Sequence, residues 1–165
     1  MSQVWLITGS SRGLGRAFAE AALASGCQVA AAARNAEDLA ELKDKYGDLV
    51  LPLPLNVTSE AQASEAVKAT IRTFGKLDVL VNNAGYGNVA PIEDTTLEDF
   101  RAQIETNLFG VIILTKAVLP YFGSGVRATS FKSLPSQVAS DPLGAHRMQP
   151  QSGAWRVSPK RWRKR

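Results

Sequence analysis

The stretch Thr-Gly-Ser-Ser-Arg-Gly-Leu-Gly at residues 8–15 constrains the fold of this chain more than any other. It follows the apolar run 4–7 and leads into the helix-forming run 16–23, so it predicts a strand, a glycine turn and a helix. Glycines turn the chain through positive φ and let a ligand approach the backbone. The N–H groups at the start of the helix would suit a pyrophosphate. The G-x-x-x-G-x-G spacing is not the commoner G-x-G-x-x-G, so the turn alone is weak evidence.

Composition favours one soluble domain. The chain has 165 residues, 45% of them apolar, which is enough for a core. Cys27 is the single cysteine, so no internal disulfide can form, and we expect a core residue in a reducing compartment. No leader precedes the first strand and no apolar run approaches a membrane span, so we expect a cytoplasmic protein without membrane contact.

Strand and helix signals alternate after the turn. Apolar runs at 27–33, 49–55 and 77–81 predict three more strands, the middle one at a sheet edge because it contains Pro52 and Pro54. Helices are predicted from Asn35 to Tyr46, from Thr58 or Ser59 to Phe74, and over about 97–121. This alternation predicts an α/β fold with a Rossmann-type, doubly wound parallel sheet. Because residues 126–165 show no such alternation, we expect the sheet to be incomplete, with about four to five strands, and the strand at 77–81 to lack its outer neighbour.

Ligands of such sheets bind beyond the carboxyl ends of the strands. Four polar or glycine-rich features fall there, namely residues 9–15, Arg34, Asn56 and residues 82–85, which predicts a binding site at this rim. Asn107 and Gly110 lie inside the long predicted helix although both residue types are poor helix formers. Their position suggests a packing or functional role, and an exposed helix asparagine explains Asn107 equally well.

Taken together, residues 3–122 resemble the short-chain dehydrogenase/reductase superfamily. The resemblance rests on the glycine turn, on Leu-Asn-Val-Thr at 55–58, on Leu-Asp-Val-Leu-Val-Asn-Asn-Ala-Gly at 77–85, and on Asn-Leu-Phe-Gly at 107–110. It implies oxidoreductase chemistry, with hydride passing between a nicotinamide and a small alcohol or carbonyl substrate that the sequence does not identify.

The resemblance also implies site residues. Asn107 would hold a water in the proton relay, and Asn56, with Val57 beside it, stands where the family usually has Asp beside the adenine. Asn83, Ala84 and Gly85 would line the adenine ribose and steady the sheet. The residues implied to wrap the phosphates and the nicotinamide side are Gly9, Ser11, Gly13, Leu14 and Gly15.

Charge predicts which nicotinamide dinucleotide binds. An NAD site needs a carboxylate at the end of the second strand, whereas a 2′-phosphate needs cations. Ala32 and Ala33 offer no carboxylate, and Arg12 and Arg34 offer two guanidiniums that can fork onto a phosphate. We therefore expect NADP as the cofactor rather than NAD.

The final residues differ from the rest. Residues 1–125 carry 10 Lys/Arg and 14 Asp/Glu, whereas residues 126–165 carry 9 and 1. We predict a dinucleotide-binding domain over 1–122 and a non-homologous, irregular tail over 123–165. The family's chemistry requires a serine and a tyrosine four residues before a lysine. The last tyrosine is Tyr121, so this catalytic pair is absent from the sequence.

A frameshift in the coding DNA near residues 123–126 would explain why residues 123–165 differ from the rest of the sequence. Residues 147–152, written as CGT ATG CAG CCG CAA AGT, give Tyr-Ala-Ala-Ala-Lys when read from the third base. The same shift over the whole tail permits an apolar strand, a serine pair and this motif at the family's spacing. The sequence thus predicts a cofactor cradle without turnover.

The sequence leaves two other functions open. One is a non-catalytic dinucleotide-binding or interaction module. The other is nucleic-acid binding through the basic, tryptophan-containing residues 155–165, which we do not favour because out-of-frame reading of G+C-rich DNA yields the same residue types. A homo-oligomer is an expectation for the family rather than for this chain, because the family's dimer helices would include one that the sequence lacks.

Overall fold

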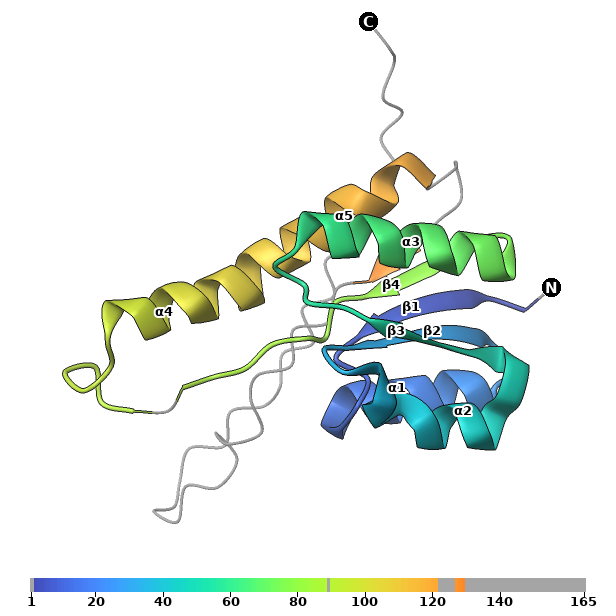
Figure 1. Ribbon diagram of the computed structural model, residues 1–165, viewed down its shortest axis with the longest axis horizontal. Helices are drawn as coiled ribbons and strands as arrows, with labels where there is room; N and C mark the ends of the chain where they lie inside the picture. Colours follow the sequence, from blue (N-terminus) through green and yellow to red (C-terminus); the bar gives the residue numbers. More distant parts are fainter. Residues whose placement is uncertain (1, 89, 122–126, 130–165) are drawn as a thin grey trace, which may run out of the picture.

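The computed structural model describes residues 2–88, 90–121 and 127–129. Strands and helices alternate along these residues, as the sequence predicts (Figure 1). The elements are β1 (Val4–Thr8), α1 (Gly13–Ala24), β2 (Gln28–Ala33), η1 (Ala36–Leu39), α2 (Ala40–Tyr46), η2 (Gly47–Leu49), β3 (Val50–Pro54), α3 (Glu60–Phe74), β4 (Val79–Val81), α4 (Leu97–Ile104), η3 (Glu105–Phe109), α5 (Gly110–Val118), η4 (Leu119–Tyr121) and β5 (Arg127–Thr129).

The strands form one parallel sheet in the order β3-β2-β1-β4-β5. The chain runs outward from β1 to β3 and then returns to the other side of β1 with β4. The strand order therefore reverses between β1 and β4, which is where open α/β sheets bind ligands. The prediction of a doubly wound, incomplete Rossmann-type sheet is confirmed.

Successive residues of each strand supply two separate cores. Leu6 and Ala30 pack with α3 and α5 on one face of the sheet, whereas Ile7 and Ala31 pack with α1 and α2 on the other. Figure 1 shows these helix pairs on opposite sides of the sheet. Because both faces are covered, the strands read as continuous apolar runs rather than as alternating ones.

Helix-capping residues lie at the helix ends that the sequence predicts. The Asn35 side chain accepts the Glu37 N–H at the start of η1, and the Ser59 side chain accepts the Gln62 N–H at the start of α3. Gly75 ends α3 in the left-handed region with φ of 80°. The prediction that the strand with Pro52 is an edge strand is also confirmed for the described part of the chain, in which β3 pairs with β2 and with no other strand.

A short fifth strand corrects the expectation that β4 lacks an outer neighbour. β5 pairs in parallel with β4, with Val79 opposite Arg127 and Val81 opposite Thr129. Parallel pairing uses backbone N–H and C=O groups, so three residues can form it without an apolar sequence pattern. The other predictions for residues 123–165, including the irregular tail, lie outside the described residues.

The helical run Leu97–Tyr121 corrects a second expectation. An 18-residue stretch of it has a mean hydropathy of 1.3, and 17% of that stretch is buried. Among the described residues, this is one helix that is long and apolar enough to cross a membrane. The expectation that no apolar run approaches a membrane span is therefore wrong. Length and composition are weak evidence, because core helices pass the same test. Leu114 and Val118 of this run are fully buried against the sheet and α3.

Asp78 joins the starts of β1 and β4. Its carboxylate accepts the Val4 N–H at 2.8 Å and pairs with the Lys76 ammonium at 2.7 Å. Partial burial raises the pKa of Asp78, but the hydrogen bond from Lys76, the Val4 N–H and the Lys76 charge outweigh it and hold the pKa below its ordinary value of 3.8. This tie therefore stabilises the fold at neutral pH and is lost as the pH falls through the lowered pKa.

Gly110 allows α5 to approach the loop after β3. A Cβ at Gly110 would lie 2.7 Å from Cγ2 of Val57, and both residues are buried. We expect Gly110→Ala to lower the free energy of unfolding by about 1–2 kcal/mol, because overpacking outweighs the gain in helix propensity.

A double-mutant cycle with Val57→Ala, followed by urea unfolding, checks this contact. The two substitutions together should cost less than the sum of the single ones, because the smaller residue 57 leaves room for the new methyl. Strict additivity would contradict the contact.

Candidate dinucleotide site

The glycine turn joins β1 to α1 at the reversal of strand order. Gly9 and Gly13 have φ values of 68° and 60°, which favour glycine. A Cβ at Gly15 would overlap the carbonyl oxygen of Gly9 and the amide nitrogen of Asn83. Gly15 is thus required by the close packing of the turn against the residues after β4.

Thr8 and Asn83 fasten this turn to the end of β4. The Thr8 hydroxyl accepts the N–H groups of Asn83 and Ala84, both at 3.0 Å, and donates to the carbonyl of Val81 at 3.3 Å. In return, the Asn83 side-chain amide donates to the carbonyls of Thr8 at 3.0 Å and Gly9 at 3.1 Å. The two strand ends at the reversal point are therefore one hydrogen-bonded unit.

Ser10 also holds the turn, and the sequence reasoning missed it. Its buried hydroxyl donates to the Ile7 carbonyl at 2.6 Å, and its N–H donates to the Ala32 carbonyl at 3.0 Å. Ser11, which was predicted instead, is half-buried. The doubled serine was the available signal, but the pattern does not tell which hydroxyl points inward.

The start of α1 is open. Arg12 occupies the N-cap without a side-chain hydrogen bond, and the first turn of α1 contains no acidic residue. Arg12, Gly13 and Leu14 are exposed, and a Cβ at Gly13 would meet no atom within 4 Å. In the described part of the chain, no carboxylate of the first turn neutralises the N–H groups and the positive end of the helix dipole, which suit an anion.

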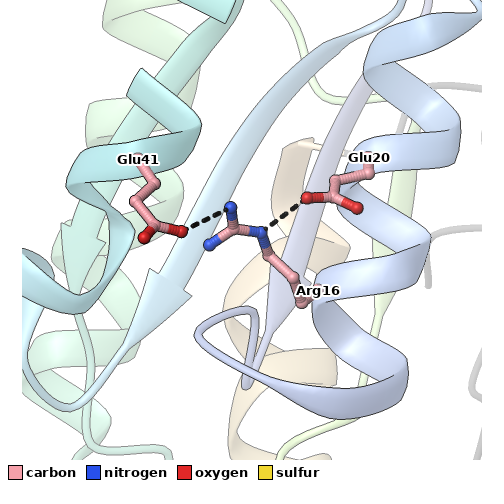
Figure 2. A network of polar contacts seen from close by, with 3 residues as sticks. All are labelled: Arg16, Glu20 and Glu41. Carbon is pink, nitrogen blue, oxygen red and sulfur yellow. Dashed lines mark hydrogen bonds and ion pairs between the residues drawn. The ribbon is translucent and has the colours of Figure 1, made fainter. Parts of the chain in front are cut away.

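Three arginines lie near this turn, and their charges are used differently. Arg16 pairs with Glu20 at 2.9 Å and with Glu41 of α2 at 3.2 Å, as Figure 2 shows. Arg12 and Arg34 are exposed, and neither has an ion pair or hydrogen bond from its side chain to another described residue. Two guanidiniums thus remain available at the rim, whereas the third is neutralised.

The end of β3 supplies one exposed and one buried candidate. Asn56 is exposed, and its side-chain oxygen accepts hydrogen bonds from Thr58. Val57 is 7% exposed and packs in the core against Gly110. The side chain of Val57 therefore contributes to packing.

Asn107 is tied to the loop after β4 rather than directed away from it. It lies in the π-helical segment η3, and its side chain accepts the Tyr86 N–H at 3.0 Å and donates to the Tyr86 carbonyl at 2.7 Å. A Cβ at Gly85 would lie 2.8 Å from Oδ1 of Asn107. The structure therefore brings Asn107 together with Gly85, and its amide positions this loop through both of its polar atoms.

The described residues were also compared with the requirements of a metal site and of a reactive cysteine. Among residues 2–88, 90–121 and 127–129, no group of three or more His, Cys, Asp or Glu side chains could hold a metal ion. Cys27 is half-buried and packs beside the core of α1 and α2. The predicted serine, tyrosine and lysine positions of the alternative reading frame lie outside the described residues.

The sequence profile of the short chain dehydrogenase family matches residues 3–129. The chain belongs to the short-chain dehydrogenase family. The match covers the glycine turn, Asn56, the Asn83 loop and Asn107, so the resemblance on which these residues were selected is confirmed at the level of the family.

Curated relatives and solved structures agree with this assignment. The oxidoreductase BOA17 of Botryotinia fuckeliana is 45% identical over 95% of this chain and 57% of its own length. A short-chain dehydrogenase structure from Streptomyces avermitilis has a TM-score of 0.69 and 41% identity, over 72% of this chain and 44% of its own. A 3-ketoacyl-(acyl-carrier-protein) reductase from Brucella melitensis, complexed with NADH, has a TM-score of 0.70 and 32% identity, over 73% of this chain and 50% of its own.

The chain spans about half the length of the curated relatives it matches. The alignment with the Botryotinia relative covers 95% of this chain, so it extends into residues 123–165. The family assignment itself rests on residues 3–129, which include every described element from β1 to β5.

Replacing Thr8 by Val should remove the acceptor for two backbone N–H groups while keeping the shape of the side chain. We expect the free energy of unfolding to fall by about 2–3 kcal/mol, because each donor left without an acceptor costs about 1–3 kcal/mol when buried. Thr8→Ser keeps the hydroxyl and should cost less than about 1 kcal/mol. Urea unfolding of both variants measures the difference, and equal losses would contradict the role of the hydroxyl.

Proposed function

We propose that this chain binds NADP at the rim formed by the glycine turn and the ends of β2, β3 and β4. The observation that carries the proposal is the charge at this rim. Arg12 and Arg34 are exposed and unpaired among the described residues, and β2 ends in Ala32 and Ala33 without a carboxylate. A 2′-phosphate is the group that such cations recognise, whereas the ribose hydroxyls of NAD require an acid there.

The pyrophosphate fits the open start of α1. Backbone N–H groups near Gly13 and Leu14 can donate to it, and no side chain at Gly13 stands in its way. Leu14 is 48% exposed and offers an apolar contact on the nicotinamide side. The fixed turn, held by Thr8 and Asn83, keeps these groups in place before a ligand arrives.

The reaction proposed for the family to which this chain belongs is hydride transfer between the nicotinamide and a small alcohol or carbonyl compound. The cofactor supplies or accepts the hydride when bound. Proton transfer would need a tyrosine whose pKa is lowered by a nearby lysine, with a serine that holds the substrate oxygen. No tyrosine follows Tyr121 in this sequence. We therefore propose cofactor binding without turnover, with a frameshift near residues 123–126 as the cause.

Asn107 has a positioning role in the proposed site. Its side-chain amide is engaged with both backbone polar groups of Tyr86 and so holds the loop after β4. The nucleic-acid alternative depends on residues 155–165, which lie outside the described residues.

Calorimetric titration with NADPH and NADH tests the choice of cofactor. Arg34→Ala and Arg12→Ala should each weaken NADPH binding about 10- to 100-fold, because a charge-assisted hydrogen bond contributes about 1.5–3 kcal/mol, and should change NADH binding much less. Arg16→Ala is the matched control, because Glu20 and Glu41 already neutralise Arg16. An equal loss for both nucleotides, or the same loss in Arg16→Ala, would contradict the assignment.

Turnover assays test the second half of the proposal. The 165-residue chain should not oxidise NADPH with any of a panel of ketones and aldehydes, because it has no Tyr-x-x-x-Lys pair. A second chain, in which the alternative frame replaces residues 127–165 and is continued to its own stop codon, should gain turnover. Measurable turnover by the first chain would refute the proposal, and sequencing the coding DNA around residues 123–126 tests the frameshift itself.

A further inference from the structure

Two side-chain amides on one helical face hold the loop that follows β4. Gln103, in the last turn of α4, accepts the Asn88 N–H on its Oε1 at 2.8 Å. Asn107, four residues later, accepts the Tyr86 N–H at 3.0 Å and donates to the Tyr86 carbonyl at 2.7 Å. Residues four apart on a helix lie on the same face, so both amides contact the loop from one side.

The spacing of these contacts is that of an extended chain over residues 86–88. Four helical residues advance by about 6 Å and two extended residues by about 6.6 Å, so Asn107 and Gln103 stay in register with residues 86 and 88. Asn107 binds both the N–H and the C=O of Tyr86, as a neighbouring strand would. The helix thus takes the place of a strand beside this loop, which Figure 1 shows passing along it toward the start of α4.

Gly87 lies between the two held residues, and its backbone groups face the other way. The N–H and C=O groups of successive residues in an extended segment point to opposite edges. Those of Gly87 therefore point away from the helix that binds Tyr86 and Asn88. They have no hydrogen-bond partner among the described residues, and Gly87 is half-buried. A backbone donor and acceptor are thus left for a ligand on the edge opposite Gln103.

The loop after β4 lies on the side of the proposed site opposite Arg34. It begins next to Ala84, whose N–H donates to the Thr8 hydroxyl at the glycine turn, where the pyrophosphate is proposed to bind. β4 and β2 flank β1 on opposite sides, and β2 leads to Arg34. With the 2′-phosphate half of the dinucleotide directed toward Arg34, the other half is directed toward the loop after β4.

We propose that Gln103 is a positioning residue for the nicotinamide half of the dinucleotide. With Asn107 it keeps residues 86–88 extended, so that the N–H and C=O of Gly87 are presented to that half. This inference rests on the proposed dinucleotide site and adds to it a residue of α4. The hydrogen bond from Asn88 to Gln103 removes the entropic cost of ordering the loop when the ligand binds.

Calorimetric titration of the full 165-residue chain tests this role with two ligands. One is NADPH, and the other is 2′-phospho-ADP, which keeps the pyrophosphate but lacks the nicotinamide and its ribose. Gln103→Met keeps the length of the side chain without the acceptor, so it should weaken NADPH binding about tenfold and 2′-phospho-ADP binding less than about twofold. Gln103→Glu keeps an oxygen at the same reach and should restore NADPH binding to within about twofold.

Gln62→Met is the matched control, because Oε1 of Gln62 also accepts a backbone N–H, that of Asn56 at 2.7 Å, at the end of β3. Both ligands contain the adenosine half, so this substitution should leave the ratio of their dissociation constants unchanged. A purely structural role of Gln103 would likewise leave this ratio unchanged.

Three results would overturn the positioning role alone. These are unchanged NADPH binding in Gln103→Met, equal weakening or complete loss of both ligands in that variant, and failure of Gln103→Glu to restore NADPH binding. If the unmodified chain binds neither ligand, the dinucleotide site itself is wrong, and the inference with it.

Discussion

The hydroxyl of Thr8 joins the ends of β1 and β4, the two strands between which the strand order reverses. It accepts the N–H groups of Asn83 and Ala84, and the Asn83 amide returns two hydrogen bonds to the carbonyls of Thr8 and Gly9. Parallel strands end in open loops, and a loop with unpaired backbone groups would move. This exchange of hydrogen bonds instead fixes the glycine turn, and through it the start of α1, in one arrangement. The positions of the other residues at the carboxyl ends of the strands are set relative to this turn.

Much of the framework could be predicted from the sequence because its signals are local. Apolar runs mark the strands, Asn35 and Ser59 mark helix starts, and Gly75 marks a helix end in the left-handed region. The pairing of prolines with an edge strand follows from the missing N–H groups of proline. The family resemblance selected residues that lie together in the structure, because the Asn83 side chain is hydrogen-bonded to the glycine turn.

What could not be predicted depends on contacts between residues far apart in the sequence. The sequence does not show that Ser10 rather than Ser11 is buried, since that is decided by the carbonyls of Ile7 and Ala32. Nor does it show that the Asn107 amide is engaged with Tyr86, or that Val57 packs against Gly110. The sequence does not reveal the short strand β5, because its pairing with β4 needs only backbone groups. The apolar character of the helical run Leu97–Tyr121 was also missed, because polar residues precede its apolar part.

At the carboxyl ends of the strands, some polar side chains are engaged by neighbouring residues and others are not. The ion pairs of Arg16 with Glu20 and Glu41 join α1 to α2 and contribute to the scaffold, whereas the guanidiniums of Arg12 and Arg34 are exposed and have no ion-pair partner among the described residues. Beyond β3, the side-chain oxygen of Asn56 accepts two hydrogen bonds from Thr58. Residues of the same type thus differ in whether a neighbour has already engaged their polar atoms.

The central claim is that the hydrogen bonds between the Thr8–Gly9 segment and residues 83–84 fix the glycine turn before any ligand binds. Native-state hydrogen exchange of the Asn83 and Ala84 amides, measured without ligand, tests it most directly. If the account is correct, both amides exchange as slowly as those of β1, because they open only when the sheet opens. Exchange at the rate of an unstructured peptide, while the β1 amides remain protected, would contradict it.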